Sequence, residues 1–497
     1  MLQLTAADVA RATGATFLEE ATGGKAEVRD AQLSRTVADV VIDSRQVHEG
    51  SLFVCIKGER VDGNEYAVAA VKAGAAAVVL TSDIVDVSPN LLCGLAQQER
   101  CAVLRAEGDD AEEFLLRLAG AWRERNPQWT VVGVTGSVGK TTTKDMLAAG
   151  LAVGGRVHAT AGNHNNLIGM SLTLLSAETS DQFVVCEMGM DHAGELTRLT
   201  RAARPDVALV TNVGTSHIGN LGSREAIARA KAEICAGMRP TDAADGRVPS
   251  CLVLTSDNDF GALIEDEYAR PAGIEVLRVG TRPDDAVCAR TVTLDDEGLP
   301  TATLAFADGL ELGCTLEVPG RHVVSDLLLA MAIVWRLGVD REAAAQAIAR
   351  MPRTGMRLEV KTAPGRPRVI DDSYNASPNS MAGALDVLAS MACTGRRVAV
   401  LGEIGELGDQ SPLLHGLVGA YAAAKGLDLV AFVGGEAARQ MADAARTMGF
   451  SDDRLELFGS CDQALATLAP VLAEDDLVLV KASRFMGLDA FAKGVLA

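Results

Sequence analysis

A glycine-rich turn between an apolar strand and a helix constrains this chain more than any other feature. The segment Val131–Lys144 reads VVGVTGSVGKTTTK, so a β-branched run stops at glycines and a Lys-Thr pair begins the next helix. Gly136 and Gly139 allow the backbone to turn and to direct N–H groups inward, and the helix N-terminus favours negative charge. Lys140 can reach the β- and γ-phosphates of a nucleotide, and the Thr141 hydroxyl can bind Mg²⁺. The pattern predicts a P-loop for a nucleoside triphosphate.

One position departs from the usual spacing of this loop. The usual P-loop has glycine at position 134, whereas this chain has Val134 and places Gly133 one residue earlier. A plain strand–helix turn is the alternative interpretation, but the position between an apolar strand and a helix favours nucleotide binding. The residues predicted to surround the phosphates are Thr135, Gly136, Ser137, Val138, Gly139, Lys140, Thr141 and Thr142.

The chain is long and acidic, which limits the classes of protein it can belong to. Its 497 residues are too many for one core, so about two to four domains are expected. The net charge of −20 argues against a nucleic-acid partner, whose phosphates require a basic face. We expect no signal peptide, and no membrane span because no run of about eighteen apolar residues occurs. The ten scattered cysteines lack metal-binding spacing and fit buried, reduced thiols. We therefore expect a cytoplasmic protein, and we expect it to be a monomer.

Three regions of different pattern predict an α/β protein with three domains. Residues 1–105 combine short strands and helices, as in a small mixed α/β domain. Residues 106–352 alternate helices with almost continuously apolar strands, which predicts a parallel sheet covered by helices, with a β-rich appendage at 270–318. Residues 353–497 alternate in the same way after a linker at 351–355, which predicts a Rossmann-like domain of doubly wound type.

The expected elements can be given by residue range. Expected strands are 40–42, 51–56, 76–80, 130–135, 182–187, 207–211, 251–256, 368–372, 397–402, 428–433 and 476–481. Expected helices are 65–74, 110–124, 141–152, 194–202, 223–237, 323–337 and 340–350.

Three side chains after the P-loop are candidates for a metal site. Glu187 ends an apolar strand, where a P-loop fold places an acidic partner of Mg²⁺. His217 follows the next strand at the sheet edge where ligands bind, although a lone histidine is more often structural and Mg²⁺ prefers oxygen. Lys231 lies among small apolar residues of a helix, and periodicity alone favours a surface lysine there.

Five segments, in this order and spacing, resemble the Mur ligase family, whose members build the peptide stem of bacterial cell-wall precursors. The segments are TGSVGKTTTK (135–144), GNHNNLIG (162–169), EMG (187–189), NVGTSH (212–217) and AKAEI (230–234). The P-loop of that family reads T-G-x-x-G-K-T, which accounts for the shifted glycine.

The resemblance implies a catalytic centre with two Mg²⁺ ions. Lys140, Glu187, His217 and Lys231 are its implied catalytic residues. Thr141 and Glu187 are implied to hold one ion, and His217 and a carbamylated Lys231 the other. The carbamate, formed with CO₂, would turn a cation that Mg²⁺ repels into an anionic oxygen ligand.

The two ends of the chain resemble particular members of the family. IDSRQVHEGSLF (42–53) and KGERVDG (57–63) are similar to the UDP-binding domain of the ligases that add the third residue or the terminal dipeptide. VIDDSYNASPNSM (369–381), LGEIGELG (401–408) and VKASR (480–484) resemble the ligases that add D-alanyl-D-alanine, and the D-Y-A-H-T-P and D-N-P-R patterns of the third-residue ligases are absent from the sequence.

These resemblances imply the reactants and their contacts. ATP would phosphorylate the terminal carboxylate of UDP-N-acetylmuramoyl-tripeptide, and the amine of D-alanyl-D-alanine would attack the acyl phosphate. The implied substrate-binding residues are Asp43, Ser44, Arg45, Lys57, Gly58, Asn163, Asn166, Asn375 and Arg484. The further implied ATP-binding residues are Asn258, Arg321, Asp372 and Tyr374.

Two positions depart from the family pattern near the expected adenine site. Thr255-Ser256-Asp257 stands where the family has N-A-D, and GRHVVSD (320–326) stands where it has G-R-H-N-x-x-N. An asparagine amide has N–H donors, whereas an ionised aspartate has no hydrogen-bond donor. With Asp326 at this position, the sequence does not predict which residue contacts the adenine. Asn258 is the candidate substitute.

Other functions remain as alternatives. The nearest are a third-residue ligase and a folylpolyglutamate-type ligase, and the surroundings of Asp43-Ser44-Arg45 argue against the second. A P-loop ATPase that regulates a partner is an alternative of a different class.

Overall fold

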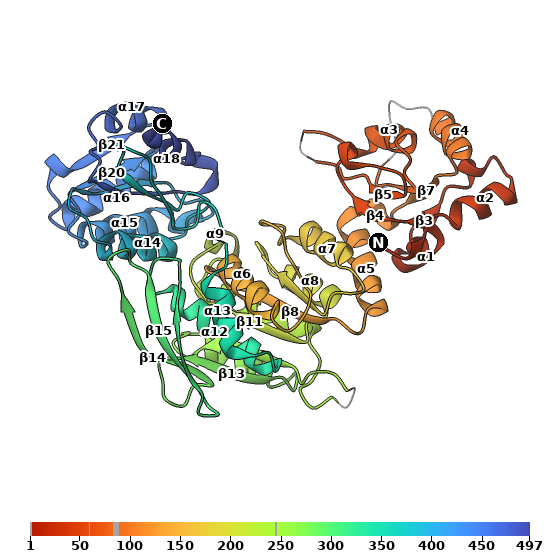
Figure 1. Cartoon of the computed structure of the whole chain (residues 1–497). Helices are drawn as coiled ribbons and strands as arrows, with labels where there is room; N and C mark the ends of the chain where they lie inside the picture. The colour runs from red at the N-terminus through yellow and green to blue at the C-terminus, as the bar shows by residue number, and fades with distance from the viewer. Residues whose placement is uncertain (1, 59, 83–88, 244–245, 353) are drawn as a thin grey trace.

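Three α/β units follow one another along the chain (Figure 1). The computed structural model describes residues 2–58, 60–82, 89–243, 246–352 and 354–497. The predicted fold class is confirmed, because each unit is built on a mainly parallel sheet with helices packed on it. The domain limits at 105/106 and 352/353 stay predictions. Arg353, within the predicted linker, lies outside the described residues.

The N-terminal unit is a five-stranded sheet in the order β2-β7-β6-β5-β4. Only β2 runs antiparallel to its neighbour, and the strands from β5 to β7 are almost fully buried because helices cover them. The strands are β2 (Thr16–Phe17), β4 (Asp39–Val41), β5 (Ser51–Val54), β6 (Ala77–Leu80) and β7 (Ala102–Arg105), beside a small pair β1 (Leu4–Thr5) and β3 (Thr36–Val37). The helices are α1 (Ala6–Thr13), α2 (Ala26–Leu33), α3 (Ala67–Lys72) and α4 (Pro89–Glu99). The three predicted strands are confirmed to within two residues at each end.

The central unit is a nine-stranded sheet in the order β16-β15-β14-β13-β12-β11-β8-β10-β9. The strands from β9 to β13 are parallel, so their carboxyl ends meet at one edge. The strands are β8 (Thr130–Thr135), β9 (Val157–Ala159), β10 (Phe183–Glu187), β11 (Val207–Val210), β12 (Cys251–Thr255), β13 (Glu275–Gly280), β14 (Val287–Leu294), β15 (Pro300–Phe306) and β16 (Glu311–Thr315). The helices are α5 (Ala111–Arg125), α6 (Lys140–Leu151), α7 (Leu167–Ser176), α8 (Glu195–Ala203), α9 (Ile218–Leu221), α10 (Arg224–Ala232), α11 (Gly261–Ile264), α12 (Val323–Arg336) and α13 (Arg341–Ala349).

Two predictions about this unit are wrong in detail. The β-rich segment at 270–318 is not a separate appendage, because β13 pairs in parallel with β12 and β14–β16 extend the same sheet. The helix predicted at 223–237 is α-helical only to Ala232 and continues as a 3₁₀ turn. At that point the Glu233 carboxylate accepts the N–H groups of Gly194 and Thr197 and so caps α8.

The C-terminal unit is a six-stranded sheet in the order β17-β18-β22-β19-β20-β21. All pairs except β17–β18 are parallel, which confirms the Rossmann-like prediction. The strands are β17 (Glu359–Lys361), β18 (Arg368–Asp371), β19 (Arg397–Gly402), β20 (Leu429–Val433), β21 (Leu455–Phe458) and β22 (Leu477–Lys481). The helices are α14 (Pro378–Ser390), α15 (Ser411–Ala423), α16 (Glu436–Thr447), α17 (Cys461–Leu468) and α18 (Asp489–Leu496).

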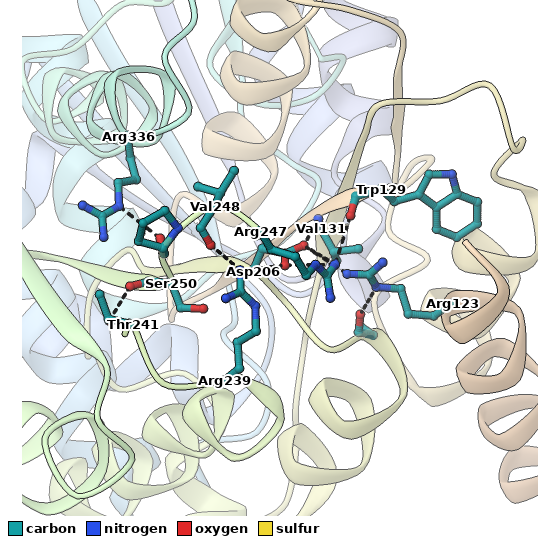
Figure 2. Close-up of polar contacts among 12 residues, drawn as sticks. Arg123, Trp129, Val131, Asp206, Arg239, Thr241, Arg247, Val248, Ser250 and Arg336 are labelled. Carbon is teal, nitrogen blue, oxygen red and sulfur yellow. Dashed lines mark hydrogen bonds and ion pairs between the residues drawn. The ribbon is translucent and has the colours of Figure 1, made fainter. Parts of the chain in front are cut away.

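A buried ion cluster fixes the start of the P-loop strand (Figure 2). Asp206, just before β11, accepts the Val131 N–H at 2.8 Å and the Arg123 guanidinium at 3.0 Å, and both charged side chains are almost fully buried. Arg247 and Arg239 reach the same carboxylate at 3.0 and 3.4 Å. The carboxylate therefore ties the base of β8 to α5 and to the segment before β12.

Two further expectations concern cysteines and membrane spans. All ten cysteines are unpaired and eight of them are buried, as predicted. Burial raises the pKa of the Cys186 thiol to about 12, so it packs as a small apolar side chain. Among the described residues, no helix combines the length and the apolar character needed to cross a bilayer.

Candidate functional site

A cavity of about 720 Å³ lies at the carboxyl edge of the central sheet. The P-loop, the loops after β10 and β11 and the first turn of α12 form one side of it. Residues 372–384 and Lys481 of the C-terminal unit form the other side. The cavity is therefore bounded by two units, as expected where a nucleotide and a second reactant must meet.

The P-loop is shaped by its glycines and held by Asn212. Gly136 and Gly139 have φ angles of 146° and 86°, which favour glycine, and α6 begins directly after them at Lys140. The Asn212 side chain accepts the Val138 N–H at 3.1 Å and donates to the Val138 carbonyl at 2.9 Å. The Lys140 ammonium donates to the Gly136 carbonyl at 2.8 Å, so it already lies over the loop. Burial lowers the pKa of Lys140, and the nearby Glu187 opposes that shift.

Thr141 and Glu187, two predicted metal ligands, lie in direct contact. The Thr141 hydroxyl donates to the Glu187 carboxylate at 2.9 Å, and both residues are buried. The other Glu187 oxygen accepts the Asn165 amide at 2.8 Å. Oxygen ligands on neighbouring strand and helix ends are those that Mg²⁺ prefers, so this pair fits a magnesium ion.

Lys231 is buried beside Lys140. Its pKa is lowered well below the ordinary value, first by burial and then by the Lys140 charge, while Asp191 opposes the shift. Within the described part of the chain, the Lys231 amine has no ion pair or hydrogen bond. Both effects favour the neutral amine of Lys231 over its ammonium form.

His217 faces two carboxylates, which come from two different units. Its Nδ1 atom lies 3.1 Å from the Asp191 carboxylate and 2.5 Å from the Glu406 carboxylate, which belongs to the C-terminal unit. The pKa of Glu406 is lowered by this contact. The ligand atoms of the three residues lie within 4.8 Å of one another, close enough to share a cation. The contacts of the described residues do not join His217 to Lys231.

The expected adenine contacts are only partly brought together. Asp326 lines the cavity, whereas Asn258 and Arg321 are not among its lining residues. Asn258 caps a turn by accepting the Phe260 N–H at 3.0 Å, and the Arg321 guanidinium donates to the Val292 carbonyl at 2.8 Å. The Arg321 guanidinium is thus engaged elsewhere, whereas the buried Asn258 amide nitrogen has no partner among the described residues.

The C-terminal candidates divide in the same way. Asp372, Tyr374 and Asn375 line the cavity, whereas the exposed Arg484 does not. The Lys481 ammonium lies 2.5 Å from the Asp372 carboxylate and 3.0 Å from the Asn375 carbonyl. It therefore holds these two cavity-lining residues in place.

The remaining candidates lie outside or at the rim of the cavity. Asn163 lines it, and Asn166 also caps α7 by accepting the Gly169 N–H. The N-terminal candidates lie in the first unit, where Arg45 makes a two-pronged contact with Asp43 at 2.6 and 2.9 Å. That contact holds the pKa of Asp43 at about 2. Ser44 lies between Asp43 and Arg45 and is partly exposed. Lys57 and Gly58 lie on the exposed segment that follows β5.

Several site residues were not singled out from the sequence. Asn165, Asn212, Lys481 and Glu406 lie inside segments that carried the family resemblance, so that signal was present. Asp191 and Arg357 carried no signal, because their roles arise from contacts between remote segments. The Arg357 guanidinium lies 4.4 Å from the centre of the Tyr374 ring.

Comparisons with known proteins agree with this geometry. The family model for the Mur ligase family catalytic domain matches residues 36–116, the Mur ligase middle domain matches 134–334, and the Mur ligase glutamate ligase domain matches 356–484. A curated relative, the UDP-N-acetylmuramoyl-tripeptide–D-alanyl-D-alanine ligase of Bacillus subtilis (strain 168), is 35% identical and aligns over 95% of this chain and 96% of its own.

Two solved structures extend the likeness to the whole fold. MurF from Acinetobacter baumannii has a TM-score of 0.84 at 28% identity and covers 100% of this chain and 99% of its own. MurF from Thermotoga maritima, solved in complex with ADP, has a TM-score of 0.75 at 25% identity and covers 94% of this chain and 98% of its own. The chain belongs to the Mur ligase family.

Proposed function

We propose that this chain is an ATP-dependent ligase that joins D-alanyl-D-alanine to the terminal carboxylate of UDP-N-acetylmuramoyl-tripeptide, releasing ADP and phosphate. One observation carries the proposal: the P-loop with Thr141 and Glu187 lines the same cavity as Tyr374 and Asn375 of the C-terminal unit. A nucleotide and an amine acceptor can therefore meet there. The substrates are those named for the Bacillus subtilis relative.

The first step transfers the γ-phosphoryl group from ATP to the tripeptide carboxylate. Both reactants are anionic, so positive charge must be concentrated between them. Lys140 supplies part of it from the P-loop, and Thr141 and Glu187 would hold a Mg²⁺ that neutralises the phosphates. The products of this step are ADP and the acyl phosphate.

In the second step the amine of D-alanyl-D-alanine attacks the acyl carbon. The tetrahedral intermediate expels inorganic phosphate, and the amine nitrogen loses a proton as the amide forms. The acyl phosphate must be shielded from water, and the C-terminal unit that closes one side of the cavity supports this role. A covalent enzyme intermediate is not needed, because ATP activates the carboxylate.

Lys231 is the residue that we propose to carry a carbamate. Its neutral amine attacks CO₂, the nitrogen loses one proton, and an anionic carbamate results. Burial and the neighbouring Lys140 support the reactive neutral form of the amine. A second Mg²⁺ would then be shared between this carbamate and His217.

The three units would then have separate tasks. Residues 1–105 would anchor the UDP group through Asp43, Ser44 and Arg45, residues 106–352 would bind ATP, and residues 353–497 would bind the dipeptide and cover the reaction. Ten unpaired cysteines fit a reducing compartment, so we place the reaction in the cytoplasm. The monomeric state stays a prediction.

A substrate panel tests the function. Phosphate release should require UDP-N-acetylmuramoyl-tripeptide and D-alanyl-D-alanine together, and mass spectrometry should detect the pentapeptide product. Addition of diaminopimelate or lysine to the UDP-dipeptide would instead indicate a third-residue ligase. ATP hydrolysis that proceeds equally well without either substrate would identify a different kind of ATPase.

A further inference from the structure

Asp326 places a carboxyl group against the phosphate-binding loop. It lies in the first turn of α12, is 7% exposed, and lines the cavity. A methyl group added at Gly139 would lie 2.5 Å from one Asp326 carboxyl oxygen and 3.1 Å from the other. The carboxyl group therefore touches the loop where a nucleotide's phosphates are expected to bind.

The cations near this carboxyl group are already engaged. The Lys140 ammonium donates to the Gly136 carbonyl, and the Lys144 ammonium donates to the Thr160 carbonyl and pairs with Asp145. Among the residues that the structure describes, none forms an ion pair with Asp326. Burial raises the pKa of Asp326 to about 8, opposed only by a hydrogen bond from Thr143.

The charged and titratable groups on the surrounding elements do not contribute to the shift of the Asp326 pKa. α12 packs on α6, α13 and the strands β12 to β15. Their titratable groups are Lys140, Lys144 and Asp145 on α6, Arg341 and Glu342 on α13, Cys251 on β12, Glu275 and Arg278 on β13, and Cys288 and Arg290 on β14. His322 precedes α12 and Arg336 ends it. No charge on any of these groups contributes to the shift of the Asp326 pKa.

An anionic Asp326 would repel the nucleotide that this cavity is proposed to bind. A triphosphate carries several negative charges, and a carboxylate in a buried site acts on them through a low effective dielectric. The neutral acid, by contrast, offers one O–H donor beside an acceptor oxygen, so it can make one of the two donations of an asparagine amide.

We propose that Asp326 is held as a neutral carboxylic acid that faces the nucleotide, and that ATP and ADP bind only while it keeps this proton. The inference rests on the proposed function as far as the nucleotide is concerned. It adds a proton-dependent residue to the binding site and accounts for an aspartate at a position where the family pattern has asparagine.

Nucleotide affinity should fall as the pH rises, because Asp326 then loses its proton. Asp326 is neutral below about pH 8, so nucleotide affinity is at its full value there. A bound polyphosphate raises the pKa of the acid further, so the dissociation constant should increase by about tenfold per pH unit above this point.

Calorimetry on the full-length protein tests the pH effect. The dissociation constants of Mg-ADP and of a non-hydrolysable ATP analogue would be measured from pH 6.5 to 9.5 for wild type and for Asp326→Asn. Wild type should weaken by about tenfold per unit above pH 8, and Asp326→Asn should lose most of that slope. Asp257→Asn, which removes an exposed carboxylate at the same cavity, should keep the wild-type slope.

Infrared difference spectroscopy tests the protonation itself. Wild type at pH 7 should show a protonated-carboxyl band that disappears at pH 10 and is missing from Asp326→Asn. A flat wild-type binding profile, an equal slope in Asp326→Asn, or no such band would overturn the inference. Failure to bind nucleotide at any pH would instead contradict the proposed function, and the infrared band would still decide the state of Asp326.

Discussion

Lys231 is the residue whose chemistry depends most on its surroundings. On an exposed helix its ammonium would be a solvated cation, but here the side chain is buried close to a second lysine. Burial and the Lys140 charge both lower the pKa of Lys231, and both therefore favour its neutral amine.

If Lys231 carries the proposed carbamate, Lys231→Ala should lower kcat by a factor on the order of a hundred or more, because an anionic metal ligand would be lost. Acetate or formate should restore part of the activity by entering the space left by the carbamate. Lys140→Ala is the matched control: it removes a cation, so it should lose activity without any rescue by carboxylates. Steady-state kinetics with increasing acetate measure both effects, and full activity of Lys231→Ala would dismiss the carbamate.

At the scale of elements, the position of the P-loop depends on how β8 begins. The strand's first buried N–H and three arginines converge on one carboxylate, that of Asp206. Burial lowers the pKa of Arg123 to about 10, and the Asp206 charge opposes that shift. The cluster therefore holds together only while the aspartate is present.

Asp206→Ala should destabilise the central unit by about 3–5 kcal/mol, because it leaves the buried Arg123 charge without its carboxylate and the Val131 N–H without its acceptor. The matched control is Glu124→Gln, which breaks the exposed ion pair with Arg204 and should change stability by less than about 1 kcal/mol. Denaturant unfolding followed by circular dichroism compares the two. Equal stabilities would show that the cluster does not anchor the strand.

The elements also show what the sequence can and cannot predict. β8 and α6 were predictable because a β-branched run, a glycine turn and a helical run follow one another. α7 was not predicted, since LIGMSLTLLS is apolar on nearly every face and shows no clear period. The 3₁₀ end of α10 was missed because Glu233 contacts α8, which is remote in sequence.

In the candidate site, too, local patterns were predictable and contacts between remote segments were not. Thr141 and Glu187 were predictable from neighbouring strand ends, because parallel strands place their carboxyl ends at one edge. The contact of Asp191 and Glu406 with His217 was not predictable, because it joins two units and depends on their relative placement.

For the whole molecule, two sets of contacts between the C-terminal and central units bear on the opening of the cavity. Near the cavity, the Gly219 N–H donates to the Glu406 carbonyl at 2.9 Å and the Gln410 amide donates to the Gly222 carbonyl at 3.0 Å. Farther away, Arg368 pairs with Glu297 at 2.9 Å, where the long strands of the central sheet reach the C-terminal unit (Figure 1). We expect opening of the cavity to break the first set of contacts and to leave the second in place.

Glu406→Gln should therefore shift the nucleotide-free enzyme towards more open arrangements. The substitution removes the charge that faces His217 but keeps the backbone contact at Gly219. Because the Glu406 side chain is 55% exposed, its contact with His217 contributes at most about 1 kcal/mol, which limits the shift to about fivefold in the open-to-closed ratio. Single-molecule energy transfer between labels on α8 and α16 measures this ratio. Glu436→Gln, whose partner Arg439 lies on the same helix, should leave it unchanged, and an identical distribution for Glu406→Gln would show that the His217 contact does not hold the units together.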